Sequence, residues 1–326
     1  MRGEHVPSAD FTLSPDDFTF IGQGLNRPEC VVELDNGQIV SGDWDGGVAI
    51  VDANGGVRKI IAKSVIFGEP LKPNGVAVNP DGSFLVTHLS EEHGGVFRLD
   101  RDGGLEEVLV QVDGIELPPT NFVLRDALGR IWITVSTRLV PRYRARTIDH
   151  ADGFIVLLDD RGARIVADNL GFTNEVRLDA SGRFLYVNET FGRRLTRFVV
   201  SPIGELLDRT TVSGFGPGTF PDGLTLDAEG GFWITSVFSN RIIRILPSGE
   251  SRIVFEDCDQ SYIGDIEEKF MSGQLARERI KGVKGRVLGN ISSLVFTGTD
   301  RKNAILGCLD DARLACFRSP VAGARQ

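Results

Sequence analysis

Residues 220–234 read FPDGLTLDAEGGFWI, and this stretch decides the fold. A polar turn leads into a short apolar run, a Glu-Gly turn follows, and a second apolar run ends the stretch. Residues 73–86 (PNGVAVNPDGSFLV) and 173–187 (TNEVRLDASGRFLYV) repeat this order of features. Turn residues with glycine between two apolar runs are a strong sequence signal of a β-hairpin. The three stretches therefore predict repeated antiparallel hairpins.

The pattern occurs six times along the chain. Its copies share one polar position, occupied by Glu29, Asn74, Asn121, Asn174, Asp222 and Ser292, and successive positions are 45, 47, 53, 48 and 70 residues apart. A third apolar run follows each hairpin, and fourth-strand candidates include residues 57–61, 107–110 and 253–256. Four short strands per repeat are typical of a propeller blade. The chain is therefore predicted to be all-β, a six-bladed β-propeller with four-stranded antiparallel blades. A pair of β-sandwiches is the alternative, and the regular spacing fits it less well.

The uneven spacings predict where the propeller carries extra chain. We expect a single domain over residues 1–326, with an N-terminal arm at 1–18, a loop insertion at 137–152 and a short helical insertion at 260–288 before the last blade. Apolar residues between 266 and 280 recur at helical spacing, interrupted by Gly273.

Composition and charge exclude several classes of function. The 326 residues carry a formal net charge of −9, which argues against binding nucleic acid, whose phosphates require clustered Lys and Arg. No apolar run is long enough to span a membrane, and residues 1–10 do not resemble a signal peptide, so a cytoplasmic protein is the default expectation. The four cysteines show no CxxC spacing and are expected to be reduced.

The shared polar position predicts a ring of oxygen ligands. Because the first strands of propeller blades line the central axis, these six residues are expected to form one ring. Asn and Asp are common turn formers, so chance accumulation is an alternative interpretation. Glu29 counts against chance, since Glu is not a favoured turn residue and a buried carboxylate must be paired or coordinated. Carboxylates and amide oxygens without His or Cys suit a hard cation: Ca²⁺ first, with Mg²⁺, Mn²⁺ or Zn²⁺ as alternatives.

The chain resembles the superfamily of gluconolactonase, regucalcin and strictosidine-synthase-like proteins, with paraoxonase and diisopropyl fluorophosphatase as more distant relatives. The resemblance covers residues 20–323 and is most specific at 171–174, 185–190, 220–223 and 232–234. It implies that Glu29, Asn174 and Asp222 bind a catalytic divalent metal, with Asn121 as a second Asn ligand. It also implies hydrolysis of lactones or other esters. Residues 186–190 are similar to the strictosidine-synthase branch, which lacks the metal cluster.

We therefore expect a cytoplasmic, metal-dependent lactonase or esterase that acts on a small lactone, such as a sugar-acid lactone. The metal would polarise the carbonyl, and Asp222 is the predicted catalytic residue, as general base or as nucleophile. Arginines of the 137–152 loop are expected either to be solvated or to form a lid that binds an acidic substrate. The residues predicted to bind substrate are Asn74, His88, Arg138, Asn188 and Glu189.

Three alternatives remain open at this point. A metal-free lyase or synthase of the strictosidine type would use Glu29 or Glu189 as an acid-base residue. A non-catalytic, ligand-binding propeller would hold no metal. A phosphotriesterase would share the metal-based mechanism.

Overall fold

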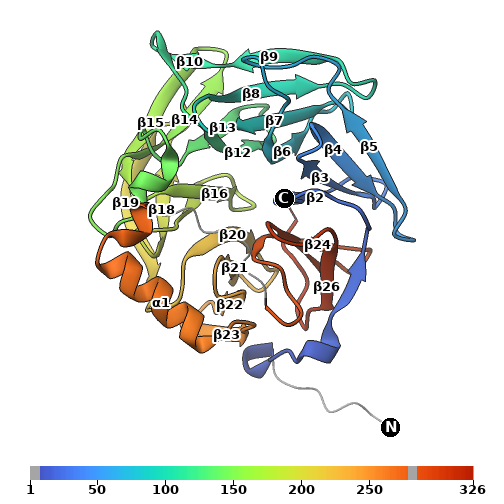
Figure 1. Ribbon diagram of the computed structural model, residues 1–326, viewed down its shortest axis with the longest axis vertical. Helices are drawn as coiled ribbons and strands as arrows, with labels where there is room; N and C mark the ends of the chain where they lie inside the picture. The colour runs from blue at the N-terminus through green and yellow to red at the C-terminus, as the bar shows by residue number, and fades with distance from the viewer. Residues whose placement is uncertain (1–7, 278–284, 326) are drawn as a thin grey trace.

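The structure is a computed structural model that describes residues 8–277 and 285–325, and it confirms the six-bladed β-propeller. Six four-stranded antiparallel sheets are arranged radially about one axis (Figure 1). Five blades are consecutive in sequence: β2 (Val31–Glu33), β3 (Ile39–Asp43), β4 (Gly47–Val51) and β5 (Val57–Ile61); β6 (Pro73–Val78), β7 (Phe84–Leu89), β8 (Gly94–Leu99) and β9 (Leu105–Leu109); β12 (Thr120–Arg125), β13 (Ile131–Val135), β14 (Gly153–Asp159) and β15 (Gly162–Leu170); β16 (Thr173–Leu178), β17 (Phe184–Glu189), β18 (Arg194–Val200) and β19 (Leu206–Gly214); β20 (Pro221–Leu226), β21 (Phe232–Ser236), β22 (Arg241–Ile245) and β23 (Ser251–Phe255).

The sixth blade is completed by the beginning of the chain. It contains β24 (Ile291–Thr297), β25 (Asn303–Cys308) and β26 (Leu314–Arg318), and its outermost strand is β1 (Thr19–Ile21). Strand β1 pairs antiparallel with β26, so that Phe20 lies opposite Ala315. This pairing joins the two ends of the chain and closes the ring. The sequence pattern did not indicate that β1 is part of a blade.

The two predicted insertions form short helices, and a small hairpin lies outside the blades. The 137–152 loop contains the 3₁₀ helix η3 (Arg142–Ala145). The helical insertion forms α1 (Gln260–Met271) and η4 (Gln274–Arg277), separated by Gly273 with φ at +72°, and its residues 278–284 lie outside the described residues. The hairpin consists of β10 (Gln111–Val112) and β11 (Ile115–Glu116). Within the described chain, no helix has the length and apolar character needed to cross a membrane.

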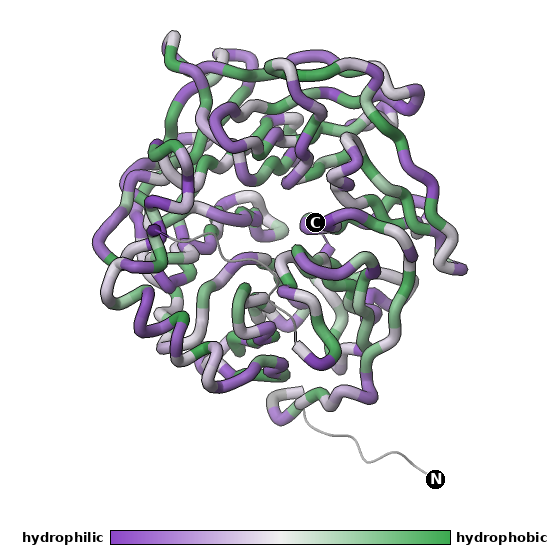
Figure 2. The backbone as a smooth tube through the Cα atoms, in the orientation of Figure 1, coloured by the Kyte–Doolittle hydropathy of each residue, from purple (hydrophilic) through white to green (hydrophobic). Residues whose placement is uncertain are grey.

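Apolar side chains fill the space between neighbouring blades. One cluster joins residues of the first four blades, among them Val48, Phe84, Trp132 and Val187. Hydrophobic residues accordingly run along the strands in Figure 2, and hydrophilic residues gather at many of the turns. Trp132 and Trp233 occupy equivalent positions of two repeats, and both are fully buried. Their indole Nε1 atoms donate to Asp126 (2.9 Å) and Asp227 (3.0 Å) respectively.

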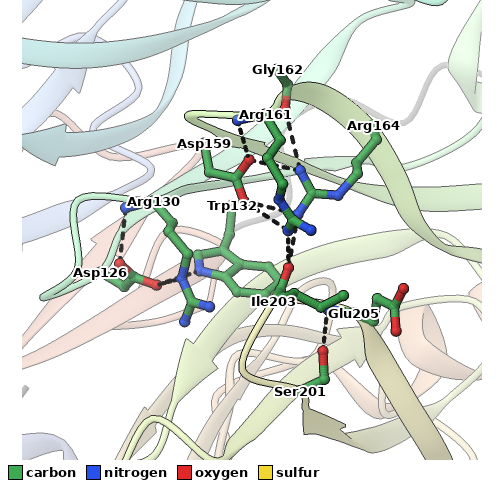
Figure 3. Close-up of polar contacts among 10 residues, drawn as sticks. All are labelled: Asp126, Arg130, Trp132, Asp159, Arg161, Gly162, Arg164, Ser201, Ile203 and Glu205. Carbon is green, nitrogen blue, oxygen red and sulfur yellow. Dashed lines mark hydrogen bonds and ion pairs between the residues drawn. The ribbon is translucent and has the colours of Figure 1, made fainter.

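Polar contacts tie outer turns of neighbouring blades together. Figure 3 shows the Asp159 carboxylate between Arg161 and Arg164, whose guanidinium lies 2.8 Å from both Asp159 oxygens. Both arginines also donate to the carbonyl of Ile203 in the next blade. These contacts connect the β14–β15 hairpin to the β18–β19 turn, far from the axis residues described below.

Glycines allow the inner strands of adjacent blades to approach closely. A Cβ at Gly75 would lie 2.7 Å from Phe122 Cα, and a Cβ at Gly223 would overlap the carbonyl oxygen of Ser292. A Cβ at Gly307 would overlap the carbonyl oxygen of Glu29 in the same way. Each glycine therefore lies against a residue of the predicted ring, or the residue next to it, in the neighbouring blade.

Replacing Gly223 by Ala is expected to destabilise the protein by about 3 kcal/mol, because the backbone of β24 must move to accept the methyl group. Gly214→Ala is the matched control, since nothing lies within 4 Å of a Cβ there. Urea denaturation of both variants measures the difference. Equal stability of the two variants would show that the strands do not approach as described.

Candidate active site on the propeller axis

A β-bulge places the ring residue of five blades. Pairing of the first strand with the second is interrupted at 73/76, 120/122, 173/176, 221/224 and 291/294. Asn74, Asn121, Asn174, Asp222 and Ser292 lie inside these interruptions, and Glu29 lies just before β2. First strands of neighbouring blades contact one another, so they are the innermost strands. Because a bulge redirects side chains locally and is common near active sites, it explains why one polar position recurs at the axis.

Hydrogen bonds connect ring residues from different blades. Asn74 Nδ2 donates to Glu29 Oε1 (2.7 Å) and to the carbonyl of Asn121 (3.0 Å). Ser292 Oγ donates to the carbonyl of Glu29 at 2.9 Å. The structure thus brings together ring residues of the first, second, third and sixth blades. All six ring residues are buried, with exposed fractions between 1% and 7%.

Side chains of the second strands hold the backbone of the next ring position. Thr87 Oγ1 donates to the carbonyl of Asn121 at 3.0 Å, and Thr235 Oγ1 donates to the carbonyl of Ser292. Asn188 Nδ2 donates to the carbonyls of Asp222 (3.1 Å) and Gly223 (2.9 Å). Asn188, predicted to bind substrate, therefore positions the Asp222 backbone.

Several buried oxygens of the ring have no hydrogen-bond partner within the described part of the chain. Asn121 has neither its Oδ1 nor its Nδ2 hydrogen-bonded, and Asn174 Oδ1 is also unsatisfied. The Asp222 carboxylate accepts no hydrogen bond from any described residue. Because unpaired buried polar groups are rare and costly, these atoms indicate a missing ligand.

The electrostatics of the ring favour a cation. Burial raises the pKa of Asp222 well above its usual range, and the negative charges of Glu29 and Glu175 raise it further. The carboxyl of Glu175 is held by the guanidinium of Arg177 (3.1 Å) and the backbone N–H of Leu224 (3.1 Å). Glu29 also has a partner, since its Oε2 lies 2.6 Å from Arg27 Nη1. Asp222 is thus the ring carboxylate without a direct counterion among the described residues.

The residues present fit a hard divalent cation. Among the described residues, no three His, Cys, Asp or Glu side chains gather as a metal cluster. The ring instead offers the carboxylates of Glu29 and Asp222 with the amide oxygens of Asn121 and Asn174. Such an all-oxygen donor set suits Ca²⁺ or a similar hard ion rather than Zn²⁺.

Glu189 and Arg138 are already engaged by other groups of the protein. Glu189 is fully buried and accepts hydrogen bonds from Arg194, Arg209, Thr196 Oγ1 and the backbone N–H of Gly171. Arg138 forms a two-point contact with Asp168 (2.8 and 2.9 Å) and is 40% exposed. Their contact with substrate stays a prediction.

His88, predicted to bind substrate, is fully buried between the Lys72 backbone and Glu69. Its Nδ1 accepts from the backbone N–H of Lys72 at 3.1 Å, and its Nε2 lies 3.6 Å from Glu69. Burial lowers the pKa of His88 to about 4, although Glu69 acts in the opposite direction. A proton-shuttle role near neutral pH is therefore not favoured.

An apolar cap connects the two insertions with the ring. Ala145 of η3 packs with α1 residues Ile266 and Phe270, and with Phe172 and Phe220. Phe172 and Phe220 stand two residues before Asn174 and Asp222. The cap therefore rests on the segments that enter two of the ring positions.

Two further arginines lie near the ring: Arg27 was not predicted as a site residue, and Arg142 was predicted only as one of the loop arginines that either are solvated or form a lid. Arg27 donates to Asn74 Oδ1 at 2.9 Å and stacks on Trp44, with its Cζ 4.3 Å from the ring centroid. Arg142 of the cap stacks on Phe172 at 5.1 Å and interacts electrostatically with Glu29 and Asp222. Arg27 stands two residues before the ring carboxylate Glu29, and this spacing could have indicated that Arg27 lies near the site. Nothing in the sequence distinguishes Arg142 from the other arginines of its loop.

Comparison with known proteins supports the resemblance. Residues 93–256 match the family model described as the SMP-30/Gluconolactonase/LRE-like region. A gluconolactonase from Xanthomonas campestris has a similar structure, with a TM-score of 0.66, 18% sequence identity, and coverage of 92% of this chain and 89% of that protein. Regucalcin from Agrobacterium tumefaciens, described as a calcium-binding protein, has a TM-score of 0.62, 15% identity, and coverage of 94% and 96%.

An enzyme of another reaction class shares the fold. Virginiamycin B lyase from Staphylococcus aureus has a TM-score of 0.56, 13% identity, and coverage of 92% and 98%. No curated protein matches the sequence. At these identities the solved structures show the fold alone, so function must be argued from the family and from the site.

Proposed function

This chain belongs to the SMP-30/gluconolactonase/LRE-like family, and from that premise we propose that it is a hydrolase that opens a small lactone with the help of one divalent cation. The observation that carries the proposal is the ring itself. Two buried carboxylates, Glu29 and Asp222, share the axis with the unsatisfied amide oxygens of Asn121 and Asn174.

Glu29, Asn121, Asn174 and Asp222 are the residues that would hold the cation. When bound, it supplies a Lewis acid that polarises the lactone carbonyl and stabilises the negative charge that develops on its oxygen. The two carboxylates would balance the charge of the cation, and the unsatisfied amide oxygens of Asn121 and Asn174 would coordinate it. Ca²⁺ is the ion that this donor set favours most.

Asp222 is the proposed catalytic residue. Its carboxylate accepts no hydrogen bond from the described protein, so it is free to accept the proton of an attacking water or to attack the lactone carbon itself. Asn188 and the Gly223–Ser292 contact fix the backbone on either side of Asp222. The main chain of the catalytic residue is thus held by neighbouring blades, which keeps its position fixed during the reaction.

Asn74 is a positioning residue in this account. Its amide donates to Glu29 and accepts from Arg27, so both its oxygen and its nitrogen are used within the protein. It orients the Glu29 carboxylate rather than contacting the substrate.

A pH-stat screen of lactones, with and without a chelator, tests the function. We expect acid release from at least one lactone, loss of that activity in EDTA, and recovery on adding excess Ca²⁺ or Mn²⁺. Acid release that EDTA does not affect would contradict metal dependence. Turnover without acid release would favour a lyase or synthase instead.

A further inference from the structure

Arg142 is held over the ring by the cap. It begins η3, and its guanidinium Cζ lies 5.1 Å from the centre of the Phe172 ring, which stands two residues before Asn174. In the same short helix, Ala145 is buried against α1 and Phe220. The helix is thus anchored by apolar packing, and the charges of Glu29 and Asp222 act on Arg142.

Within the described residues, the guanidinium of Arg142 forms no hydrogen bond and no ion pair, and it stacks on Phe172. Burial lowers the pKa of Arg142, so solvation by water is incomplete. Arg138 lies in the same loop, and its guanidinium forms an ion pair with Asp168. An arginine held half-buried with unused donors is a typical anion-recognition group.

The charges around the ring show what such a group would bind. A bound divalent cation would balance the charges of Glu29 and Asp222, and Glu175 is paired with Arg177. The positive charges of Arg27, which lies 2.6 Å from Glu29, and of Arg142 would then be in excess. Glu91 also acts on Arg142 and offsets part of this excess, whereas Arg146 stands close enough to Arg142 to add to it. A cation-loaded site is therefore positively charged and complementary to an anionic substrate.

We infer that Arg142 recognises a negatively charged substituent of the substrate, so that the preferred substrate is a lactone that carries a carboxylate or phosphate group. This inference rests on the proposed lactone hydrolysis and adds the substrate class and the residue that selects it. The planar guanidinium can accept two oxygens of either group side by side. Arg142 thus contributes to the binding of the substrate, whereas the ring residues contribute to hydrolysis of its ester bond.

The experiment compares three five-membered lactones: one unsubstituted, one with a ring carboxylate and one with a phosphate ester. Wild type, Arg142→Ala and Arg144→Ala are assayed with each in the presence of excess Ca²⁺. Arg144 is the matched control because it lies in the same short helix but is exposed. Thermal unfolding of each variant verifies that the cap remains folded.

The inference predicts a lower KM of the wild type for the anionic lactones than for the neutral one. Arg142→Ala should raise KM for the preferred anionic lactone by about 10- to 100-fold, the loss typical of a hydrogen-bonded charge contact, with little change in kcat. KM for the neutral lactone should stay unchanged, as should both constants in Arg144→Ala. The preferred anionic lactone identifies the group as carboxylate or phosphate.

Failure of the inference and failure of the proposed function give different results. Two results would overturn the inference but not the proposed hydrolase function. One is an equal KM of the wild type for all three lactones. The other is an equal rise of KM for neutral and anionic lactones in Arg142→Ala. If no lactone is hydrolysed, the proposed function fails. In that case, calorimetry measures the Kd of the ring-opened carboxylate product for the wild type and for Arg142→Ala. Equal Kd values would also overturn the role of Arg142 in anion recognition.

Discussion

Asp222→Asn is expected to lower kcat for lactone hydrolysis by about 10³-fold, within the range typical of a lost catalytic acid-base group, while the protein stays folded. The amide has the same shape as the carboxylate, so the bulge at 221/224 and the hydrogen bonds from Asn188 are retained. It can neither accept a proton nor act as nucleophile, and it brings no negative charge to a cation. Single-turnover and steady-state assays in saturating Ca²⁺ measure the loss.

The stability of the same variant separates catalysis from folding. In the absence of divalent cations, Asp222→Asn should be at least as stable as the wild type, because the wild-type carboxylate is buried beside Glu29 without a direct counterion. Asp160→Asn, in an exposed turn, is the control and should behave like the wild type in both assays. Activity close to wild type in Asp222→Asn would remove Asp222 from the mechanism.

Removal of the divalent cation is expected to lower the free energy of unfolding of the wild type by about 4 kcal/mol. The reference state is the protein at a free-ion concentration of about 1,000 times the Kd. For a chain of this length the change corresponds to a Tm lower by about 6 °C. The ion would join side chains of four blades (Glu29, Asn121, Asn174 and Asp222) and cancel the repulsion between two of them. Scanning calorimetry in EDTA and in excess Ca²⁺ measures the difference.

The Asp222→Asn variant provides the control for that experiment. Its Tm should respond to Ca²⁺ by much less than the Tm of the wild type, because one of the two charged ligands is gone. An equal response in both proteins would place the stabilising ion elsewhere on the surface, where acidic turns are common in a chain of net charge −9.

The blades could be predicted because their signals are local. Each hairpin carries its own turn residues and apolar runs, so the pattern of 220–234 could be found again without knowledge of long-range contacts. The closing strand β1 carries no such signal. It has three residues, and its partner β26 begins almost 300 residues later in the chain. The fourth strands β15 and β19 were also not predicted, since only one residue of β15 and none of β19 is buried at the outer edge of the blades.

The ring could be predicted because it repeats, whereas the cap could not. Glu29, Asn74, Asn121, Asn174, Asp222 and Ser292 share one register position, and the fold brings that position to the axis. Arg142 is placed by packing between η3, α1 and two phenylalanines from different blades, which is a tertiary arrangement without sequence periodicity. The same holds for Glu189, whose sequence context gives no sign of the two arginines that bind it.

Metal content tests the central claim most directly. Elemental analysis of protein purified without chelator should find about one divalent ion per chain in the wild type, Ca²⁺ being the expected ion, and much less in Asp222→Asn. Wild-type protein without a bound divalent ion, and without any stabilisation by added Ca²⁺ or Mn²⁺, would contradict the account. The ring would then be a set of turn residues, and a metal-free lyase or a binding propeller would be the better description.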